Sequence, residues 1–172
     1  MKNRLKVVTG VLVIFVIVLS VACGYLVQNR IELNDYISTQ LLSSVSIISR
    51  ELENFSEGDS EYTEYEVDLC MEYISIYDWA NTDTQTHNLD YLMLDIRTLI
   101  SLFRTSSKDD DKAYILELLK RIQPYVAQLA STEKEVGEEK NQSMWQKKLQ
   151  LFNDYYSAND YTDIHLAIIN LN

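Results

Sequence analysis

An uninterrupted apolar run near the N-terminus constrains this chain more than any other feature. The run covers residues 7–27, and 14 of its 21 residues are Val, Leu, Ile or Phe. A helix of about 20 residues crosses the hydrocarbon core of a bilayer, and these side chains favour insertion by on the order of 6 kcal/mol. No face of the run is polar, which argues against a core helix. We therefore expect residues 7–27 to be a transmembrane helix, since a strand would leave its backbone unpaired in lipid.

Charges on either side of this run predict its orientation. Residues 1–6 contain three cations, whereas only Arg30 follows the run before the first acid, Glu32. Because cationic flanks stay on the cytoplasmic side, we expect residues 1–6 to be a cytoplasmic basic N-terminus and residues 28–172 to lie outside. The sequence thus predicts a single-pass protein of the cytoplasmic membrane.

The sequence allows three interpretations of how the apolar segment is processed. Residues 7–27 can be a retained signal-anchor, a cleaved signal peptide of a secreted protein, or the leader of a lipoprotein. Residues 19–23, LSVAC, resemble a bacterial lipobox, which makes Cys23 a candidate lipidation site. Apolar residues continue past Cys23 to Val27 without a polar tether, and this favours the signal-anchor. The basic start and the lipobox-like sequence are typical of bacterial proteins.

Residues 28–172 are strongly acidic. They hold all 26 acids and 12 of the 15 Lys and Arg residues, which gives this part a net charge of −14. That balance excludes a nucleic-acid surface, which requires clustered cations. Apolar residues make up 47% of the chain, so wholesale disorder is excluded too. Two cysteines exclude a disulfide scaffold, and Cys70 lies in an apolar stripe where we expect it to be buried.

Apolar positions recur every three or four residues, which indicates amphipathic helices. One Pro and four Gly leave few breaks. The pattern predicts a first helix from the membrane to about Phe55 and further helices after breaks at 56–60, 81–86 and 105–107. Pro124 should kink or restart the fourth segment, which Gly137 should close. The predicted stripes begin at Leu33, Tyr62, Leu89, Ile115 and Trp145, and a short apolar tail, 164–171, suits a helix better than a strand.

These elements predict an all-α fold, with an N-terminal transmembrane helix followed by an acidic extracytoplasmic bundle of four or five helices. The layout resembles the start of the four-helix sensor domains of bacterial chemoreceptors in architecture only, because no second membrane segment is present. The first stripe is close to a heptad and offers a homodimer seam through Leu33, Ile37, Leu41, Val45 and Ile48. Packing within its own bundle is the favoured interpretation.

Aromatic residues crowd the second segment. Tyrosine combines apolar area with a polar tip, which suits a partner or ligand surface as well as the edge of a small core. The candidate surface consists of Tyr62, Tyr65, Tyr73, Tyr77 and Trp79. We expect most of these side chains to belong to the core, and a recognition surface is the alternative.

Residues that carry chemistry are scattered. His87 and His165 are isolated and fit no metal spacing, and no phosphate-binding glycine motif is present. Asp109, Asp110 and Asp111 suit the first turn of a helix better than a calcium loop. The acids between Glu61 and Glu72 predict a solvated face, with a carboxylate-based enzyme as a minor alternative. We therefore expect no catalytic residues, cofactor or metal.

The sequence favours a membrane-anchored, non-catalytic extracytoplasmic protein that acts through protein–protein interaction as an accessory or regulatory subunit. A small-ligand binding or sensing domain, anchored by a helix or a lipid, is the alternative. It would use the Tyr-rich segment and predicts a cavity among Tyr65, Tyr73, Tyr77 and Trp79.

Overall fold

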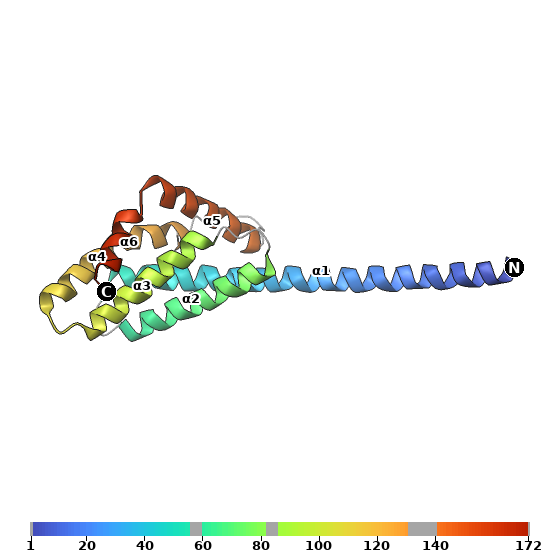
Figure 1. Cartoon of the computed structure of the whole chain (residues 1–172), viewed down its shortest axis with the longest axis horizontal. Coiled ribbons are helices and arrows are strands. Elements are labelled where there is room, and N and C mark those ends of the chain that lie inside the picture. Colours follow the sequence, from blue (N-terminus) through green and yellow to red (C-terminus); the bar gives the residue numbers. More distant parts are fainter. Residues whose placement is uncertain (1, 56–59, 82–85, 131–140, 172) are drawn as a thin grey trace. The chain divides into compact units, whose positions relative to one another are not determined.

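The computed structural model describes residues 2–55, 60–81, 86–130 and 141–171, in which every regular element is a helix. Figure 1 shows the helices in chain order, from blue to red. They are α1 Lys2–Glu53, α2 Ser60–Ala80, α3 His87–Thr105, α4 Asp109–Ala130, α5 Asn141–Ala158 and α6 Thr162–Ile169. The predicted all-α class is confirmed. The chain divides into two compact units, Met1–Asn34 and Asp35–Asn172, which are described separately below.

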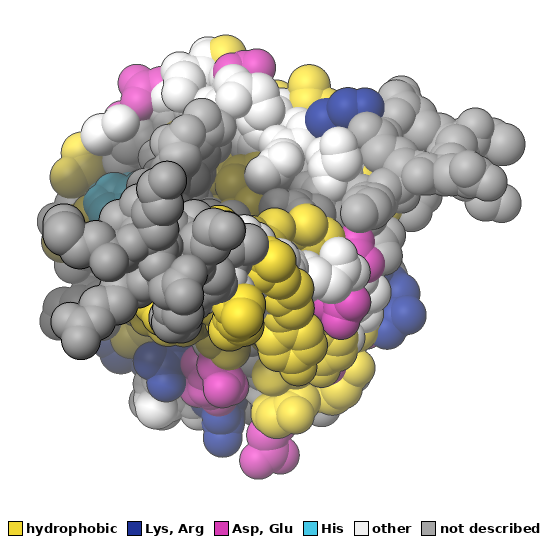
Figure 2. Space-filling view, turned by 90° about the vertical axis from the view of Figure 1, so that its right-hand side faces the viewer, with side chains coloured by type: hydrophobic (Ala, Val, Ile, Leu, Met, Phe, Trp, Pro, Cys, Tyr) yellow, Lys and Arg dark blue, Asp and Glu magenta, His cyan; other side chains and the backbone are white. Residues whose placement is uncertain are grey.

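The first unit is the N-terminal part of α1. Its side chains from Ile14 to Arg30 are all exposed, and Val21 reaches 68%. Within the described residues, α1 is the one helix that is long and apolar enough to cross a membrane. Figure 2 views the molecule from the side on which the N-terminus lies in Figure 1, and many of the described side chains that face the viewer are hydrophobic. The predicted candidate span is therefore present as a helix.

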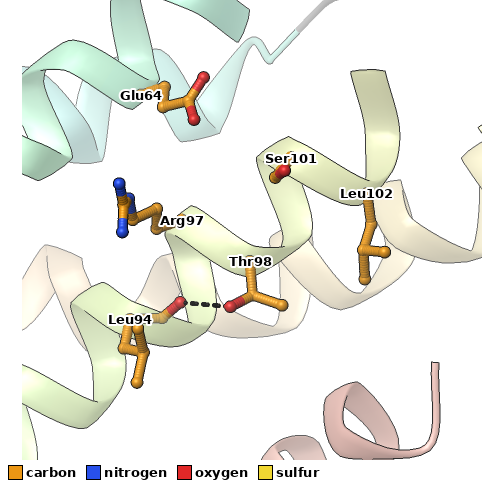
Figure 3. Close-up of a pocket in the computed structure, with 6 residues that line it drawn as sticks. All are labelled: Glu64, Leu94, Arg97, Thr98, Ser101 and Leu102. Atoms are coloured by element: carbon orange, nitrogen blue, oxygen red, sulfur yellow. Dashed lines mark hydrogen bonds between the residues drawn. The ribbon is translucent and has the colours of Figure 1, made fainter. Parts of the chain in front are cut away.

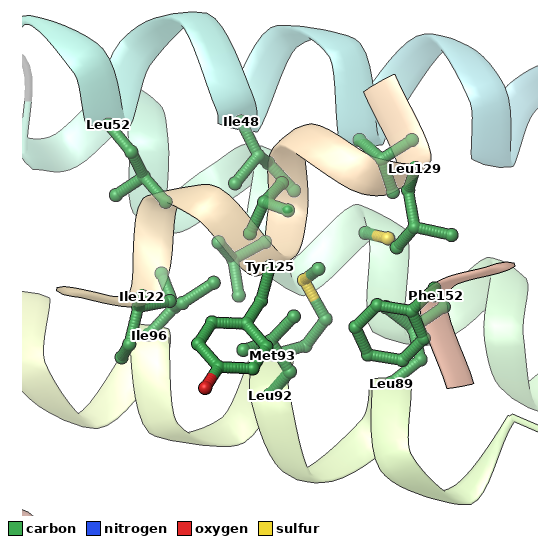
Figure 4. Packing of buried hydrophobic residues seen from close by; sticks show 14 of the residues in the cluster. Ile48, Leu52, Leu89, Leu92, Met93, Ile96, Ile122, Tyr125, Leu129 and Phe152 are labelled. Atoms are coloured by element: carbon green, nitrogen blue, oxygen red, sulfur yellow. The ribbon is translucent and has the colours of Figure 1, made fainter. Parts of the chain in front are cut away.

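The second unit has one hydrophobic core, to which α1 to α6 all contribute. Figure 4 shows Ile48 and Leu52 of α1 pointing toward α3 and α4, where Ile96 and Ile122 meet them. The predicted stripes of α1, α3, α4 and α5 supply most of this core. The largest fully buried side chains include Trp145, Tyr161, Phe152, Ile37, Leu41, Ile48, Leu52, Ile74, Leu89, Leu92, Met93 and Ile96.

The prediction that the aromatic stripe of α2 belongs to the core is wrong. Tyr62, Tyr65 and Trp79 are 47%, 61% and 82% exposed. The buried face of α2 lies beside that stripe and carries Ser60, Thr63, Glu66, Val67, Cys70, Ile74, Tyr77 and Ala80. This face is made largely of small and medium side chains, which let α2 approach its neighbours closely. The bulkier aromatic stripe, whose rings have polar tips that water can solvate, is turned outward.

Two further expectations concern helix ends. α4 runs through Pro124 without interruption, so the predicted restart does not occur. Proline removes one backbone donor, but Ile122 and Val126 on either side are fully buried and hold both halves in the core. The predicted end at Gly137 lies outside the described residues. The C-terminal tail is helical, as predicted, and α6 adds a short helix to the bundle.

Candidate functional site

The exposed face of α2 is the first candidate site. Its residues are Tyr62, Tyr65, Asp68, Glu72, Ser75 and Trp79, which we call the α2 outer face. They recur every three or four positions, so they form one strip along the helix, about 26 Å long at 1.5 Å per residue. The helix has six acids and no Lys or Arg. The α2 outer face therefore presents aromatic rings in an acidic setting.

Ion pairs with α3 fix one border of this face. The Nε atom of Arg97 lies 2.7 Å from the Oδ1 atom of Asp68, with both side chains about half exposed. One turn nearer the start of α2, Glu64 pairs with Arg104 of α3. At the opposite end of α2, Thr86 donates a hydrogen bond of 2.6 Å to Asp78 just before α3 begins. These contacts lie along the border between α2 and α3.

The two ends of α2 have different neighbours on α1. Near the start of α2, Arg50 and Glu51 lie close enough to Tyr62 to influence its hydroxyl electrostatically. Near its end, Tyr73 has a side-chain hydrogen bond with Tyr36. The second unit therefore has α1 and α2 running antiparallel. Trp79, beyond Tyr73, lies at the end of the bundle that contains Asp35, the first residue of this unit.

Tyrosine acidities on α2 follow these surroundings. The carboxylate of Glu66, followed by burial, raises the pKa of Tyr62. Burial and then the neighbouring Tyr36 raise the pKa of Tyr73. Burial raises the pKa of Tyr77, against a hydrogen bond with Gln146 that lowers it. All three hydroxyls therefore stay protonated at neutral pH and act as neutral hydrogen-bonding groups.

A shallow groove of about 330 Å³ lies between α2 and the outer side of α3. Figure 3 shows Arg97 reaching from α3 toward Glu64 on α2, with Thr98 and Leu94 on the turn below. The hydroxyl of Thr98 donates a hydrogen bond of 2.9 Å to the backbone oxygen of Leu94 in the same helix. Because opposite charges from two helices meet here, the groove carries no strong charge of one sign.

The five predicted surface residues do not all come together. Tyr77 is 3% exposed, and its ring lies 6.4 Å from that of Trp145 in the core. Tyr73 is half-buried against α1, whereas Tyr62, Tyr65 and Trp79 lie on the outer face. Since Tyr77 points inward and Tyr65 and Trp79 point to solvent, these side chains do not enclose a common cavity.

Residues of the predicted dimer seam divide between the two units. Ile37, Leu41, Val45 and Ile48 are at most 1% exposed and contact other helices of the same chain. Leu33 belongs to the first unit and is 40% exposed. A dimer through all five residues would require the bundle to open.

A second candidate site joins α3 to α6. The Nδ1 atom of His165 lies 2.9 Å from the Oδ2 atom of Asp95, whose side chain is only 5% exposed. Burial raises the pKa of the Asp95 carboxyl, and its hydrogen bond to His165 partly opposes this effect. Burial and then the Asp95 charge raise the pKa of Tyr161 far above its ordinary value. An aspartate held against an imidazole fixes the orientation of the ring.

Tyrosines surround this pair. The Tyr91 ring lies 6.1 Å from the His165 ring and 5.5 Å from the His87 ring. On the other side, Tyr125 is the hub of a cluster with Tyr155, Tyr156 and Tyr161, at ring distances of 5.0–6.0 Å. Among the described residues, His165 contacts the Asp95 carboxylate and the Tyr91 ring, an arrangement that fits a structural tie between helices. Seventy residues separate Asp95 from His165, so sequence spacing gave no signal for their contact.

Another groove, of about 380 Å³, lies beside this tyrosine cluster, where α4, α5 and α6 meet. Arg121, Tyr125 and Tyr155 line it together with Asp160 and Asp163. Tyr125 donates a hydrogen bond of 3.2 Å to the backbone oxygen of Asn159. Asp160 has a φ of 42°, the left-handed conformation that Asp tolerates better than most residues, and this reverses the chain between α5 and α6.

The carboxylates and cysteines have separate roles in the structure. Of the acids between Glu61 and Glu72, Glu66 is buried, which corrects the prediction that all of them are solvated. Cys70 is fully buried, as predicted, and burial raises the pKa of its thiol to about 12. Cys23 is exposed in the first unit. In the described part of the chain, no three His, Cys, Asp or Glu side chains gather in a way that could hold a metal ion.

The geometry thus offers one extended aromatic and acidic surface, two grooves, and a buried Asp–His tie. Comparison with protein-family models, curated proteins and solved structures finds no match to this chain.

Proposed function

We propose that this chain is a membrane-anchored, non-catalytic helical protein that acts through protein–protein interaction as an accessory or regulatory subunit. Its N-terminal helix would span the cytoplasmic membrane once as a signal-anchor. In the lipoprotein alternative, a lipid on Cys23 would replace this helix as the anchor. Residues 28–172 would then lie outside the cytoplasm. The charge difference across the apolar run supports this orientation.

The observation that carries the proposal is the outward position of Tyr62 and Tyr65 on one helix. Aromatic side chains are enriched at the energetic centres of protein interfaces. The core of this bundle is built from other residues, so these exposed rings are not needed to pack it. Because α2 has six acids and no cation, a complementary partner surface would be apolar with Lys or Arg around it. Confinement to the membrane plane would raise the effective concentration of such a partner.

Site-specific crosslinking tests this proposal. A photoreactive phenylalanine analogue in place of Tyr65 should capture a defined partner in intact membranes, because Tyr65 is 61% exposed on the α2 outer face. The matched control is Tyr114, which is 41% exposed on α4. Capture of the same proteins from both positions, or of none from position 65, would contradict the proposal. A reporter fused after Asn172 that is active only outside the cytoplasm tests the orientation.

The second candidate function is the binding of a small ligand. The groove beside the tyrosine cluster favours it, because Arg121, Asp160 and Asp163 place both signs of charge next to the Tyr125 and Tyr155 rings. That combination suits a zwitterionic aromatic or aliphatic molecule, such as a free amino acid. Bound ligand should raise the unfolding temperature of the wild type and have a smaller effect on an Arg121→Gln variant. Equal shifts in both proteins would exclude this groove.

A further inference from the structure

Trp79 is the most exposed of the large apolar side chains in the described part of the chain, at 82%. The other tryptophan, Trp145, is fully buried. A Trp side chain has on the order of 200 Å² of surface, so its exposure leaves a large apolar area to water. Tyr62 and Tyr65 are less exposed and have a hydroxyl for water to solvate, whereas Trp79 has one indole N–H.

The position of Trp79 within the bundle distinguishes it from those tyrosines. Tyr62 lies beside Arg50 and Glu51, near the end of α1. Tyr73 contacts Tyr36, near the start of the second unit, and α2 advances about 9 Å from Tyr73 to Trp79 toward that same end. Trp79 therefore lies at the end where the chain enters the bundle.

Chain length limits how far that end can lie from the apolar run. Asp35 follows Val27 by eight residues, which span about 12 Å as a helix. A bilayer has a hydrocarbon core of about 30 Å and a total thickness of about 40–45 Å, so each headgroup layer is about 5–7 Å thick. The entry end of the bundle is thus held close to the headgroup layer if the apolar run spans the membrane.

We propose that Trp79 inserts into the lipid headgroup layer of the membrane that α1 spans, and so fixes the bundle against the bilayer surface. This inference rests on the proposed membrane anchoring. Tryptophan is enriched at membrane–water interfaces because its ring is apolar and its N–H stays hydrated. We assign the contact of Trp79 to the lipid headgroup layer rather than to a protein groove, because the anchor keeps the membrane surface close to this side chain at all times.

Charge indicates which lipids suit this contact. Asp78 and Asp35 belong to the same end of the bundle, and they would be repelled by anionic headgroups. We therefore expect Trp79 to prefer zwitterionic lipid, and the contact to weaken as anionic lipid is added.

Two tryptophans in opposite surroundings allow a direct spectroscopic test. The full chain is reconstituted into phosphatidylcholine vesicles with and without bromine on the acyl chains near the headgroup, and its fluorescence is compared with that of a Trp79→Phe variant. Bromine quenches only fluorophores that touch the lipid. The difference between wild type and variant isolates Trp79, so the core residue Trp145 does not have to be replaced.

Brominated lipid should quench most of the emission that the wild type has in excess of the variant, and vesicles should protect that emission from aqueous acrylamide. The emission that remains in Trp79→Phe should change little. A second variant, Tyr62→Trp with Trp79→Phe, moves the tryptophan to the far end of α2 and should lose the lipid quenching.

Flotation separates failure of this inference from failure of the anchor. Protein that floats with the vesicles while its Trp79 emission is insensitive to brominated lipid overturns the inference and leaves the anchor intact. Protein that does not float removes the proposed anchoring itself. Equal lipid quenching of Trp79 and of a tryptophan at position 62 also overturns the inference, because the contact would not depend on the end of the bundle.

Discussion

Two stretches of α1 have similar side chains and opposite surroundings. From Ile14 to Val27 the large apolar side chains are 47–68% exposed, whereas Ile37, Leu41, Val45 and Ile48 are at most 1% exposed. In the second stretch apolar residues occupy one stripe, which the other helices cover. In the first they occupy every side, a pattern typical of a membrane span or of a helix surrounded by a large core, and the bundle does not cover them. The difference shows that the distribution of apolar residues around the helix, rather than their number, decides what surrounds each stretch.

The largest expected effect on stability comes from placing a charge in the buried stripe of α1. Ile48→Asp places an unpaired carboxylate in the core and should lower the free energy of unfolding by about 4 kcal/mol or more. Urea unfolding followed by circular dichroism measures this change. Ile48→Val is the control, with an expected loss of about 1 kcal/mol. Similar stability of the Asp variant and the wild type would mean that Ile48 is not packed in the core.

The matching change in the exposed stretch is Ile17→Asp. It should leave the unfolding of the bundle unchanged and disfavour membrane insertion by about 3 kcal/mol, the cost of an acid near the centre of a spanning helix. The fraction of protein that floats with membranes measures insertion, and Ile17→Leu serves as the control. If Ile17→Asp destabilised the bundle as much as Ile48→Asp, the two stretches would not differ in the way described.

Within the bundle, we expect the Asp95–His165 pair to give a pH effect of intermediate size. The pKa of Asp95 is raised in the folded state. Its contribution to stability is therefore fully present below about pH 3.8, the ordinary value, and is lost as pH rises through the folded pKa. Asp95→Asn cannot ionise, so its stability relative to the wild type should increase between pH 4 and pH 7. Chemical unfolding at several pH values measures this difference, and a decrease over that range would contradict it.

The smallest effect is expected at the border of the α2 outer face. Arg97 and Asp68 are both about half exposed, so their ion pair is largely screened by water. Arg97→Gln should therefore change the free energy of unfolding by less than about 1 kcal/mol. Thermal unfolding at low and high salt provides the measurement. A loss of several kcal/mol would show that this pair, rather than the buried face of α2, holds α2 in place.

Sequence patterns were sufficient wherever one kind of residue defined one face. The stripes of α1, α3, α4 and α5 could be predicted because Leu, Ile, Val and Phe repeat every three or four residues and are flanked by charges. On α2 the aromatic stripe lies next to a second stripe that contains Thr63, Glu66 and Cys70. Tyrosine fits either a core edge or a surface, so spacing could not decide which stripe is buried.

The candidate sites were less accessible to sequence reasoning. Tyr62, Tyr65 and Trp79 were found as candidates, but their outward position depends on which face α2 turns to α3. The Asp95–His165 pair could not be found, because α6 reaches α3 only through the fold. A buried polar pair of this kind is specified by tertiary packing between residues far apart in sequence, for which a single sequence offers no periodic signal.

Because Cys70 is buried, its alkylation rate reports how often the bundle opens. Alkylation requires a thiolate, and a thiol with a pKa of about 12 that is sealed in the core supplies almost none at neutral pH. Each labelling event at Cys70 therefore records a moment when α2 has separated from its neighbours. The rate at which a maleimide modifies Cys70, measured separately from modification of the exposed Cys23, counts those openings in the native protein without any engineered probe. Binding of a partner to α2 should slow that rate.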